Sequence, residues 1–255
     1  MDGPAPVVDW RDAEAYALLL GADRPIFAWE WLRRDPSYRR AADAAAWGLC
    51  ERSELDPGRW GLHAFESPAI AAPDARPVWR GDLHPHVLVA AAMKPARPAE
   101  AFDLSRFAQL ATLVRASDGG EHVLLSDGLR TVRIDIVEGS VEAGPVQLHY
   151  RLSGRESAKG PLLALRRLLA LCDQGRFGRS LHPREPSARR WIMALRVHDA
   201  LAAGAGQREI AAALLGGAAS EARWRVQAAS LRSQVQRLVR ARRALASGGY
   251  RNFLR

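Results

Sequence analysis

Residues 207–255 read QREIAAALLGGAASEARWRVQAASLRSQVQRLVRARRALASGGYRNFLR. The segment contains two helical patterns, each followed by a glycine pair. Gln207 to Leu215 forms the first pattern and ends at glycines 216–217, and Leu231 to Ala246 forms the second and ends before glycines 248–249. Glycine is favoured just past the end of a helix because it adopts the left-handed conformation without strain. The sequence therefore predicts two helices in this region, with an intervening segment.

The C-terminal quarter of the chain, residues 187–255, carries its excess positive charge. This region holds 13 arginines against three acidic residues, whereas the other 186 residues carry 24 basic and 25 acidic side chains. A basic helical region attached to a near-neutral body is typical of proteins that bind nucleic acid phosphates. We therefore expect double-stranded DNA to be a partner.

The predicted helix 231–246 has one apolar face and one basic face. With about 100° between successive residues, the apolar side chains fall together, and they are Leu231, Val235, Leu238 and Leu245. The opposite face carries Arg232, Ser233, Gln236, Arg237, Arg240 and Arg243. Arginine pairs with guanine and glutamine with adenine, so Arg232, Gln236 and Arg237 are candidates for base contact. The alternative is a solvated helix face, which the absence of any balancing acidic residue disfavours.

Other arginines are candidates for phosphate contact. Gln207 and Arg208 stand at the start of the first helix, where free backbone N–H groups bind anions. Arg223 and Arg225 lie between the two helices and extend the basic surface. The candidate phosphate contacts are Arg208, Arg225, Arg240 and Arg243. A standard helix-turn-helix has a short turn, so the long separation here predicts an insertion or an extra helix.

The first part of the chain has a different character. Five tryptophans precede residue 61, at positions 10, 29, 31, 47 and 60. Helices are predicted at 12–20, 25–33 and 37–50, from glycine stops, proline at a first turn and an aspartate cap. These patterns favour a small helical domain over residues 8–66, followed by a proline-rich linker at 67–77. The tryptophans are expected to form its core, with a docking surface at Trp29 and Trp31 as the alternative.

Residues 78–255 are predicted to form an α+β domain. An apolar run covers 87–92, a helix is predicted at 104–113, and strands are predicted at 122–126, 131–137 and 146–152. Turn residues between the strands indicate an antiparallel meander. Helices follow at 161–173, where leucines 162, 165, 168 and 169 are expected on one face, and at 187–203. The expected fold class is α+β: a small N-terminal helical domain, then a short antiparallel sheet packed with helices, and a variant helix-turn-helix at 187–247.

Enzyme and metal motifs are absent from the sequence. It has no GxSxG motif and no glycine-rich phosphate loop, so we expect no enzyme activity and no cofactor, with a nuclease or recombinase accessory role as the alternative. The histidines of His84-Pro85-His86 are predicted to be solvated loop residues without a metal. No apolar run is long enough to span a bilayer, and Cys50 and Cys172 lack redox spacing. A cytoplasmic protein without membrane contact is expected.

Motifs at both ends of the chain resemble known bacterial regulators. The C-terminal motifs are Arg208-Glu209-Ile210-Ala211, Trp224, Leu231-Arg232-Ser233-Gln234-Val235-Gln236-Arg237-Leu238 and Gly248-Gly249-Tyr250-Arg251. They resemble the secretion-system-type transcription factor DNA-binding domain. The N-terminal motifs are Asp9-Trp10-Arg11, Trp29-Glu30-Trp31-Leu32-Arg33-Arg34-Asp35-Pro36 and Tyr38-Arg39. They resemble the transcriptional-regulator-like domain that often precedes it.

This resemblance implies a regulatory role. Similar proteins are activators carried on integrative and conjugative elements of proteobacteria, where they switch on excision and transfer genes. Shorter relatives that consist mainly of the C-terminal domain act as antiactivators by binding the activator. The presence of both domains favours an activator, with RNA polymerase or an antiactivator protein as a further partner. The alternative is an antiactivator or adaptor that acts through protein contacts.

Overall fold

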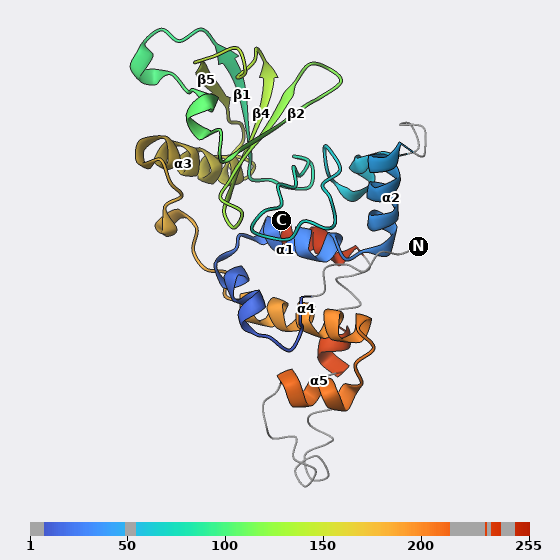
Figure 1. Ribbon diagram of the computed structural model, residues 1–255. Coiled ribbons are helices and arrows are strands. Elements are labelled where there is room, and N and C mark those ends of the chain that lie inside the picture. Colours follow the sequence, from blue (N-terminus) through green and yellow to red (C-terminus); the bar gives the residue numbers. More distant parts are fainter. Residues whose placement is uncertain (1–7, 49–54, 215–232, 234–235, 241–247) are drawn as a thin grey trace.

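The computed structural model describes residues 8–48, 55–214, 233, 236–240 and 248–255, and has the α+β fold that the sequence predicts (Figure 1). Figure 1 shows three levels: the sheet with helix α3, a middle level of α1 and the C-terminal segment, and a lower level of α4 and α5. The α-helices are α1 (Arg24–Leu32), α2 (Pro36–Trp47), α3 (Lys159–Gln174), α4 (Ala188–Ala202) and α5 (Gln207–Leu214). The 3-10 helices are η1 (Glu14–Gly21), η2 (Pro57–Trp60), η3 (Pro98–Glu100), η4 (Leu104–Phe107), η5 (Arg179–Leu181) and η6 (Gly249–Phe253). Of the helices in these residues, none has the length and apolarity needed to cross a bilayer.

The sheet has five strands in the order β2-β3-β4-β1-β5. The strands are β1 (Val87–Met93), β2 (Ala111–Arg115), β3 (Glu121–Ser126), β4 (Thr131–Glu138) and β5 (Gln147–Arg151). The predicted meander is wrong, because β1 lies between β4 and β5, parallel to β4 and antiparallel to β5. The physical reason is the apolar composition of β1, whose side chains are mostly buried. Such a strand is stable when neighbours cover both of its edges.

Residues 104–113 do not form the predicted helix. Asp103 caps the short helix η4, and the chain then extends into edge strand β2, which pairs with β3 in antiparallel register. The hairpin turn contains Gly119, which has a positive φ of 86°. Thr112 and Val114 are β-branched, and such residues favour a strand over a helix.

Helix α3 covers one face of the sheet but buries a different stripe from the one predicted. Its buried residues are Ala164, Leu168 and Leu171. Leu162 and Leu169 are 49% and 48% exposed, so the four leucines do not share the core face. Leu168 lies at i+4 from Ala164, and Leu171 at i+3 from Leu168, which is the spacing of one helix face.

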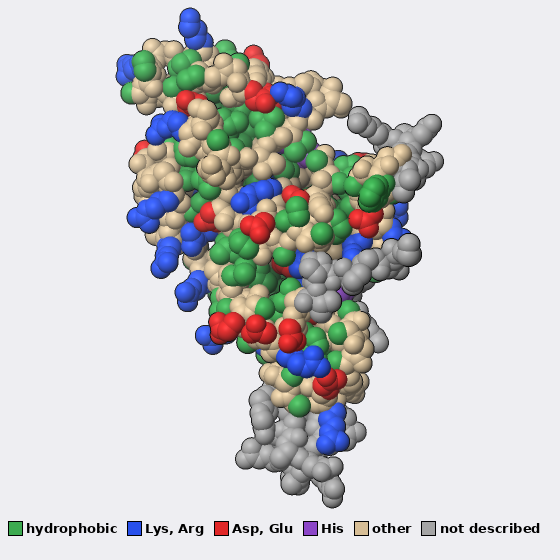
Figure 2. Space-filling view, viewed as in Figure 1, with side chains coloured by type: hydrophobic (Ala, Val, Ile, Leu, Met, Phe, Trp, Pro, Cys, Tyr) green, Lys and Arg blue, Asp and Glu red, His purple; other side chains and the backbone are tan. Residues whose placement is uncertain are grey.

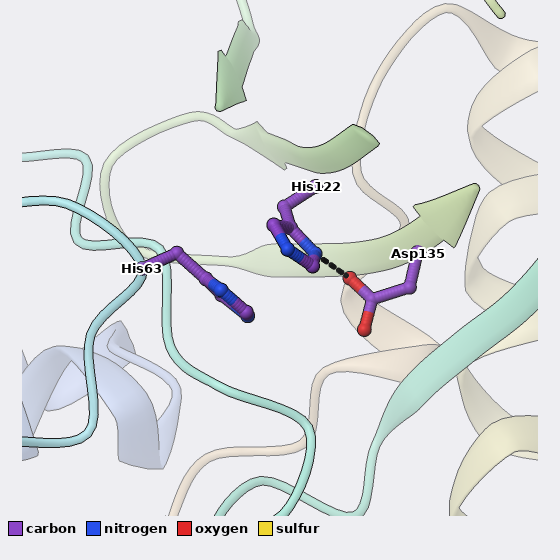
Figure 3. A group of neighbouring side chains, drawn as sticks. All are labelled: His63, His122 and Asp135. Carbon is purple, nitrogen blue, oxygen red and sulfur yellow. Dashed lines mark hydrogen bonds and ion pairs between the residues drawn. The ribbon is translucent and has the colours of Figure 1, made fainter. Parts of the chain in front are cut away.

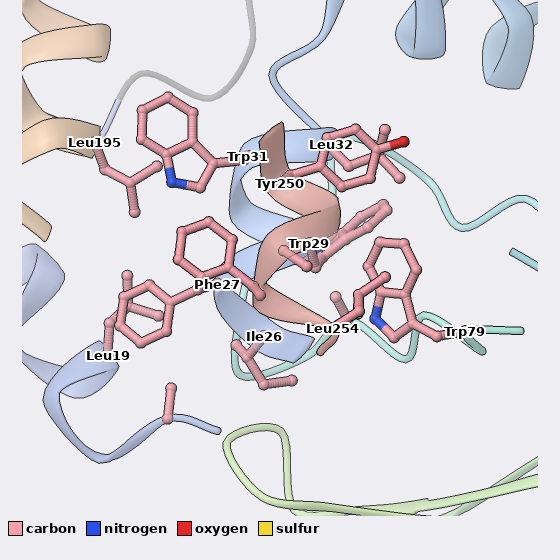
Figure 4. Packing of buried hydrophobic residues seen from close by; sticks show 14 of the residues in the cluster. Leu19, Ile26, Phe27, Trp29, Trp31, Leu32, Trp79, Leu195, Tyr250 and Leu254 are labelled. Carbon is pink, nitrogen blue, oxygen red and sulfur yellow. The ribbon is translucent and has the colours of Figure 1, made fainter. Parts of the chain in front are cut away.

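The largest core surrounds α1 and draws on both ends of the chain (Figure 4). Phe27 and Trp29 are fully buried and Trp31 is 2% exposed, so the tryptophans of α1 are core residues and do not form a docking surface. Helix η6 packs on α1, and its Phe253 stacks on Phe27 with ring centroids 6.1 Å apart. Leu195 of α4 belongs to the same core. The C-terminal segment and α4 therefore complete the core of the N-terminal helices.

The predicted helices at 25–33 and 37–50 correspond to α1 and α2, while 12–20 corresponds to the 3-10 helix η1. Pro36 opens α2, and the Asp35 side chain accepts hydrogen bonds from two backbone N–H groups of its first turn. Such a cap satisfies donors that have no partner within the helix. Gly48 ends α2 with a positive φ of 62°.

Residues 67–77 lie against α1 and the β3–β4 turn. The backbone N–H of Ala72 donates to the Glu30 carboxylate at 2.9 Å, and the Trp29 indole donates to the carbonyl of Ile70 at 3.0 Å. The turn approaches so closely that a Cβ on Gly128 would lie 1.8 Å from the carbonyl oxygen of Pro73. Glycine at this position therefore permits the close packing of the two segments.

In the sequence His84-Pro85-His86, the first histidine differs from its prediction. His84 is only 6% exposed, and its Nδ1 lies 3.1 Å from the carbonyl oxygen of Leu254. Burial lowers the pKa of His84 to about 4, so its ring is neutral at neutral pH. His84 therefore anchors the C-terminal segment and is not a solvated loop residue.

Candidate nucleic-acid interface

Helices α4 and α5 and the helical residues 236–240 share a small apolar core, which we call the α4–α5 core. Its buried members are Trp10, Val197, Ala200, Ile210, Ala211 and Leu214. Leu238 and Val239 are partly buried against it. Ile210, Ala211 and Leu214 lie at i, i+1 and i+4 and therefore share one side of α5. This core fixes α5 and residues 236–240 on the same part of the molecule.

The outward sides of these helices carry the polar residues that the sequence singles out. Gln207, Arg208, Ser233, Gln236, Arg237 and Arg240 are all exposed. In residues 236–240, the apolar side chains of Leu238 and Val239 face the core while Arg237 and Arg240 face solvent, as the helix periodicity predicts. Neither arginine forms an ion pair with another described residue. Both guanidinium groups are therefore exposed and without a described carboxylate partner.

Four of the ten predicted residues lie in parts of the chain that the structure does not describe. Arg223, Arg225, Arg232 and Arg243 lie outside the described residues. Trp224 and the segment between the two predicted helices also lie outside them. The structure thus describes six of the ten predicted residues, and all six are exposed.

A four-residue turn, Ala203-Gly204-Ala205-Gly206, connects α4 to α5. Gly204 takes a positive φ of 79°, which allows the chain to leave α4 and re-enter a helix within this short distance. The Ile210 N–H donates to the carbonyl of Gly206 at 3.0 Å, so the turn runs directly into the first turn of α5. The turn therefore holds α4 and α5 next to each other in the chain with only four residues between them.

The N-terminal segment completes the α4–α5 core, which the sequence does not predict. Trp10 is 1% exposed and packs among residues of both helices. The Arg196 guanidinium of α4 donates to the carbonyl oxygens of Trp10 at 2.8 Å and Arg11 at 2.7 Å. Arg11 in turn pairs with Glu209 of α5. No local sequence signal indicates these contacts, because nearly 200 residues separate the partners.

A buried ionic network joins α4 to α1 and η1. The Arg34 guanidinium donates to both carboxylate oxygens of Asp199 in α4 and to the Glu30 carboxylate, and Tyr16 donates to Asp199 at 2.7 Å. Burial by itself raises the pKa of Asp199, but the hydrogen bonds and charge of Arg34 outweigh it and hold that pKa below its usual value. The network is therefore charged at neutral pH and ties α4 to α1.

The surface around α5 carries charges of both signs. Figure 2 shows a group of acidic side chains above the lower end of the molecule and basic side chains beside and below them. Glu209 is the only acidic residue of α5, and its pairing with Arg11 reduces its repulsion of an anion. The basic character of the interface therefore depends on the N-terminal segment as well as on its own arginines.

Two regions of the chain match known protein families. Residues 153–255 match the family described as T6SS, transcription factor, DNA binding domain. Residues 9–63 match the family described as proteobacterial transcriptional regulator-like domain. A search of curated proteins finds no match. The first region contains α4, α5 and residues 236–240, and the second contains Trp10 and α1. The two matches support the conclusion that the chain is a DNA-binding transcription regulator.

Proposed function

We propose that this protein is a sequence-specific DNA-binding transcription activator. The observation that carries the proposal is the exposed row of Gln236, Arg237 and Arg240 on a helix whose apolar residues, Leu238 and Val239, dock on the α4–α5 core. A helix that reads DNA needs one face held by the domain and another presented to the major groove. The match of residues 153–255 to a DNA-binding domain supports the same function.

We assign different roles to the exposed residues. Gln236 and Arg237, together with Arg232, contact base edges, because amide and guanidinium groups form paired hydrogen bonds with adenine and guanine. Arg208 and Arg240, together with Arg225 and Arg243, hold phosphates, because these contacts require charge but no base pattern. Gln207, Arg223 and Ser233 complete the interface. Helices α4 and α5 brace this arrangement against the DNA backbone.

The proposed targets are excision and transfer genes of an integrative and conjugative element. This part of the proposal is supported by the joint resemblance of the two ends of the chain to activators of such elements. The match of residues 9–63 to a transcriptional regulator-like domain is consistent with it. RNA polymerase or an antiactivator protein is the proposed second partner.

The test is binding of the full-length protein to promoter fragments from its own genetic neighbourhood, with random competitor DNA at near-physiological salt. Arg237→Ala is expected to cost about 1–3 kcal/mol and to relax specificity at one base position. Arg240→Ala is expected to weaken binding to all sequences alike and to lower the salt slope by about one unit. A reporter gene under the bound promoter then measures whether the protein activates.

Arg97→Ala is the matched control for these variants. Arg97 is 78% exposed and lies near the sheet, so its removal tests the loss of one positive charge away from the interface. Equal losses on specific and random DNA for Arg237→Ala and Arg240→Ala would contradict the two roles. Loss of all wild-type binding to competitor DNA would contradict the sequence-specific function itself.

One observation favours a second candidate function, that of an adaptor acting through protein contacts. Trp47 at the end of α2 is 78% exposed, although tryptophan is usually buried. Exposed aromatic residues are typical anchors of protein interfaces. If Trp47→Ala abolishes promoter activation while DNA binding is unchanged, the helical region contacts a protein such as RNA polymerase. Loss of DNA binding in the same variant would contradict this role.

We retain, as a proposal, the division of the chain into residues 8–66, a connecting segment at 67–77 and a DNA-binding domain at 78–255. The core around α1 includes Leu195 of α4 and Phe253 of η6. The two parts are therefore expected to stay associated even when the chain between them is cut. Cleavage engineered within residues 67–77 should leave both fragments associated after size-exclusion chromatography, and separation of the fragments would contradict this expectation.

A further inference from the structure

Three side chains that the proposed function does not use meet beside the sheet (Figure 3). His122 of β3 and Asp135 of β4 stand directly opposite each other in the antiparallel register. His122 Nδ1 lies 2.7 Å from Asp135 Oδ1. The ring of His63, from the segment that follows η2, stacks on the His122 ring with centroids 3.4 Å apart. One nitrogen from each imidazole and one carboxylate oxygen all lie within 4.8 Å of one another.

The backbone holds the His63 segment in place. The His63 N–H donates to the carbonyl of Val78 at 2.9 Å, and the Arg80 N–H donates to the carbonyl of Gly61 at 2.9 Å. These two bonds flank an antiparallel bridge between Leu62 and Trp79. These backbone hydrogen bonds therefore fix the position of His63 relative to the sheet.

A second buried group orients the Asp135 carboxylate. The Arg133 guanidinium is 1% exposed and donates to Asp135 Oδ1 at 2.8 Å, and it also donates to the carbonyl oxygens of Trp79 and Val123. Both hydrogen bonds to the carboxylate from described residues go to Oδ1. No described residue donates a hydrogen bond to Oδ2.

One ligand atom in this group lacks a partner. His63 Nε2 is buried and has no hydrogen bond in the described structure. Buried polar nitrogens in native proteins nearly always have a partner, so an exception calls for a missing group. A neutral imidazole is also the form of histidine that binds metals.

We propose that His63, His122 and Asp135 bind a divalent transition-metal ion of the zinc type. Two imidazole nitrogens and one carboxylate oxygen are a common ligand set for this ion, and three protein ligands leave a position for water or an anion. Arg133 is the group that orients the carboxylate ligand, in the way that outer partners hold ligands in metal sites. Its positive charge also repels the ion, so the site is weaker than a cysteine-rich one.

The bound ion has a structural role in this proposal. It joins the segment of His63, which closes the region matching the regulator-like family, to strands β3 and β4. Local hairpin register brings His122 and Asp135 together, but only the tertiary fold adds His63. The metal site is separate from the α4–α5 core. A negative result for metal binding would therefore not bear on the proposed DNA-binding function.

The experiment is metal titration of the untagged full-length protein after removal of metals with a chelator. We expect one equivalent of Zn²⁺ or Co²⁺ to bind, the Co²⁺ form to show the visible absorption bands of a low-coordinate site, and the ion to raise the unfolding temperature. His63→Gln is the main variant, because no described residue depends on its Nε2 for a hydrogen bond. It should weaken binding at least roughly tenfold.

His122→Asn is the second variant, because asparagine retains a donor near Asp135 but lacks the second ring nitrogen. His149→Gln is the matched control, since His149 is an exposed histidine on β5 and should bind metal as the wild type does. Circular dichroism establishes that each variant is folded. The proposal is overturned if the wild type binds no stoichiometric ion, or if folded His63→Gln binds it with unchanged affinity.

Discussion

Arg34 and Asp199 form a two-bond ion pair that joins the end of α1 to the middle of α4. The Arg34 Nε and the second guanidinium nitrogen lie 2.7 Å and 2.8 Å from the two carboxylate oxygens. Arg34 is 9% exposed and Asp199 17%. A planar guanidinium matches a carboxylate in this geometry, which gives a strong and directional contact. This ion pair thus links the region that matches a DNA-binding domain to the N-terminal helices.

Arg34→Ala should destabilise the fold by about 3 kcal/mol, because it leaves Glu30 and Asp199 buried without their main partner. The measurement is chemical denaturation followed by circular dichroism. Arg97→Ala is the control, since Arg97 and Glu100 form an exposed pair and such pairs contribute about 1 kcal/mol or less. Equal stability of the two variants would show that the buried pair does not hold α4.

Acid should weaken the fold through the same carboxylates. Burial opposes the ionisation of Glu30, yet the charges of Arg34 and Arg33 keep its pKa below the usual value, and the pKa of Asp199 is also lowered. The stability that each carboxylate contributes is present above its unfolded pKa and is lost as pH falls through its folded pKa. We therefore expect the free energy of unfolding to drop steeply below about pH 4. Asp199→Asn should be less stable at neutral pH and should show a shallower loss in acid.

His84 should produce a separate loss of stability at milder pH. Its folded pKa of about 4 lies below the usual histidine pKa of 6.5, so the unfolded chain takes up a proton first as pH falls. Stability is therefore lost between about pH 6.5 and 4, by up to about 1.4 kcal/mol per pH unit. His84→Asn retains a donor for the Leu254 carbonyl but does not titrate, so its loss over this interval should be smaller. An unchanged slope in this variant would assign the effect to other groups.

Trp10→Ala should disrupt the α4–α5 core. Truncation of a buried tryptophan typically costs about 3–5 kcal/mol, and Trp10 is 1% exposed between α4 and α5. The variant should lose DNA affinity as well as stability, because α5 and residues 236–240 pack against this core. Trp47→Ala is the control: Trp47 is 78% exposed, and its stability change should remain within about 0.5 kcal/mol. Full DNA affinity in a folded Trp10→Ala protein would contradict the bracing role of the N-terminal segment.

The sequence predicts those features that depend on local periodicity. The alternation of Thr131 to Ile136 predicted β4, and the pattern that starts at Gln207 predicted α5. Within residues 236–240, Leu238 is partly buried against the α4–α5 core, while Arg237 and Arg240 are exposed. Each of these follows from the 2.0- and 3.6-residue repeats of the backbone, which a sequence displays directly.

Predictions from local sequence patterns were wrong where segments distant in the chain decide which side chains are buried. Leu162 and Leu169 share an apolar stripe in sequence, but the sheet covers the side of Ala164 and Leu168. The apolar run at 87–92 became a central strand because it was paired on both sides, and this displaced the expected meander. The secondary-structure propensity of a segment does not decide which of its faces is buried or which strand it pairs with. The larger free energy comes from removing the apolar faces of whole helices and strands from water.

The sequence alone determined the class of the fold and the basic character of the C-terminal region. Only the tertiary structure decided that Trp10 completes the α4–α5 core, that Arg34 reaches Asp199, and that His63 joins His122 and Asp135. The physical reason is the range of the interactions. Helix and strand periodicities arise from neighbouring residues, whereas pairing between distant side chains depends on how the complete chain buries its apolar surface and satisfies its charges.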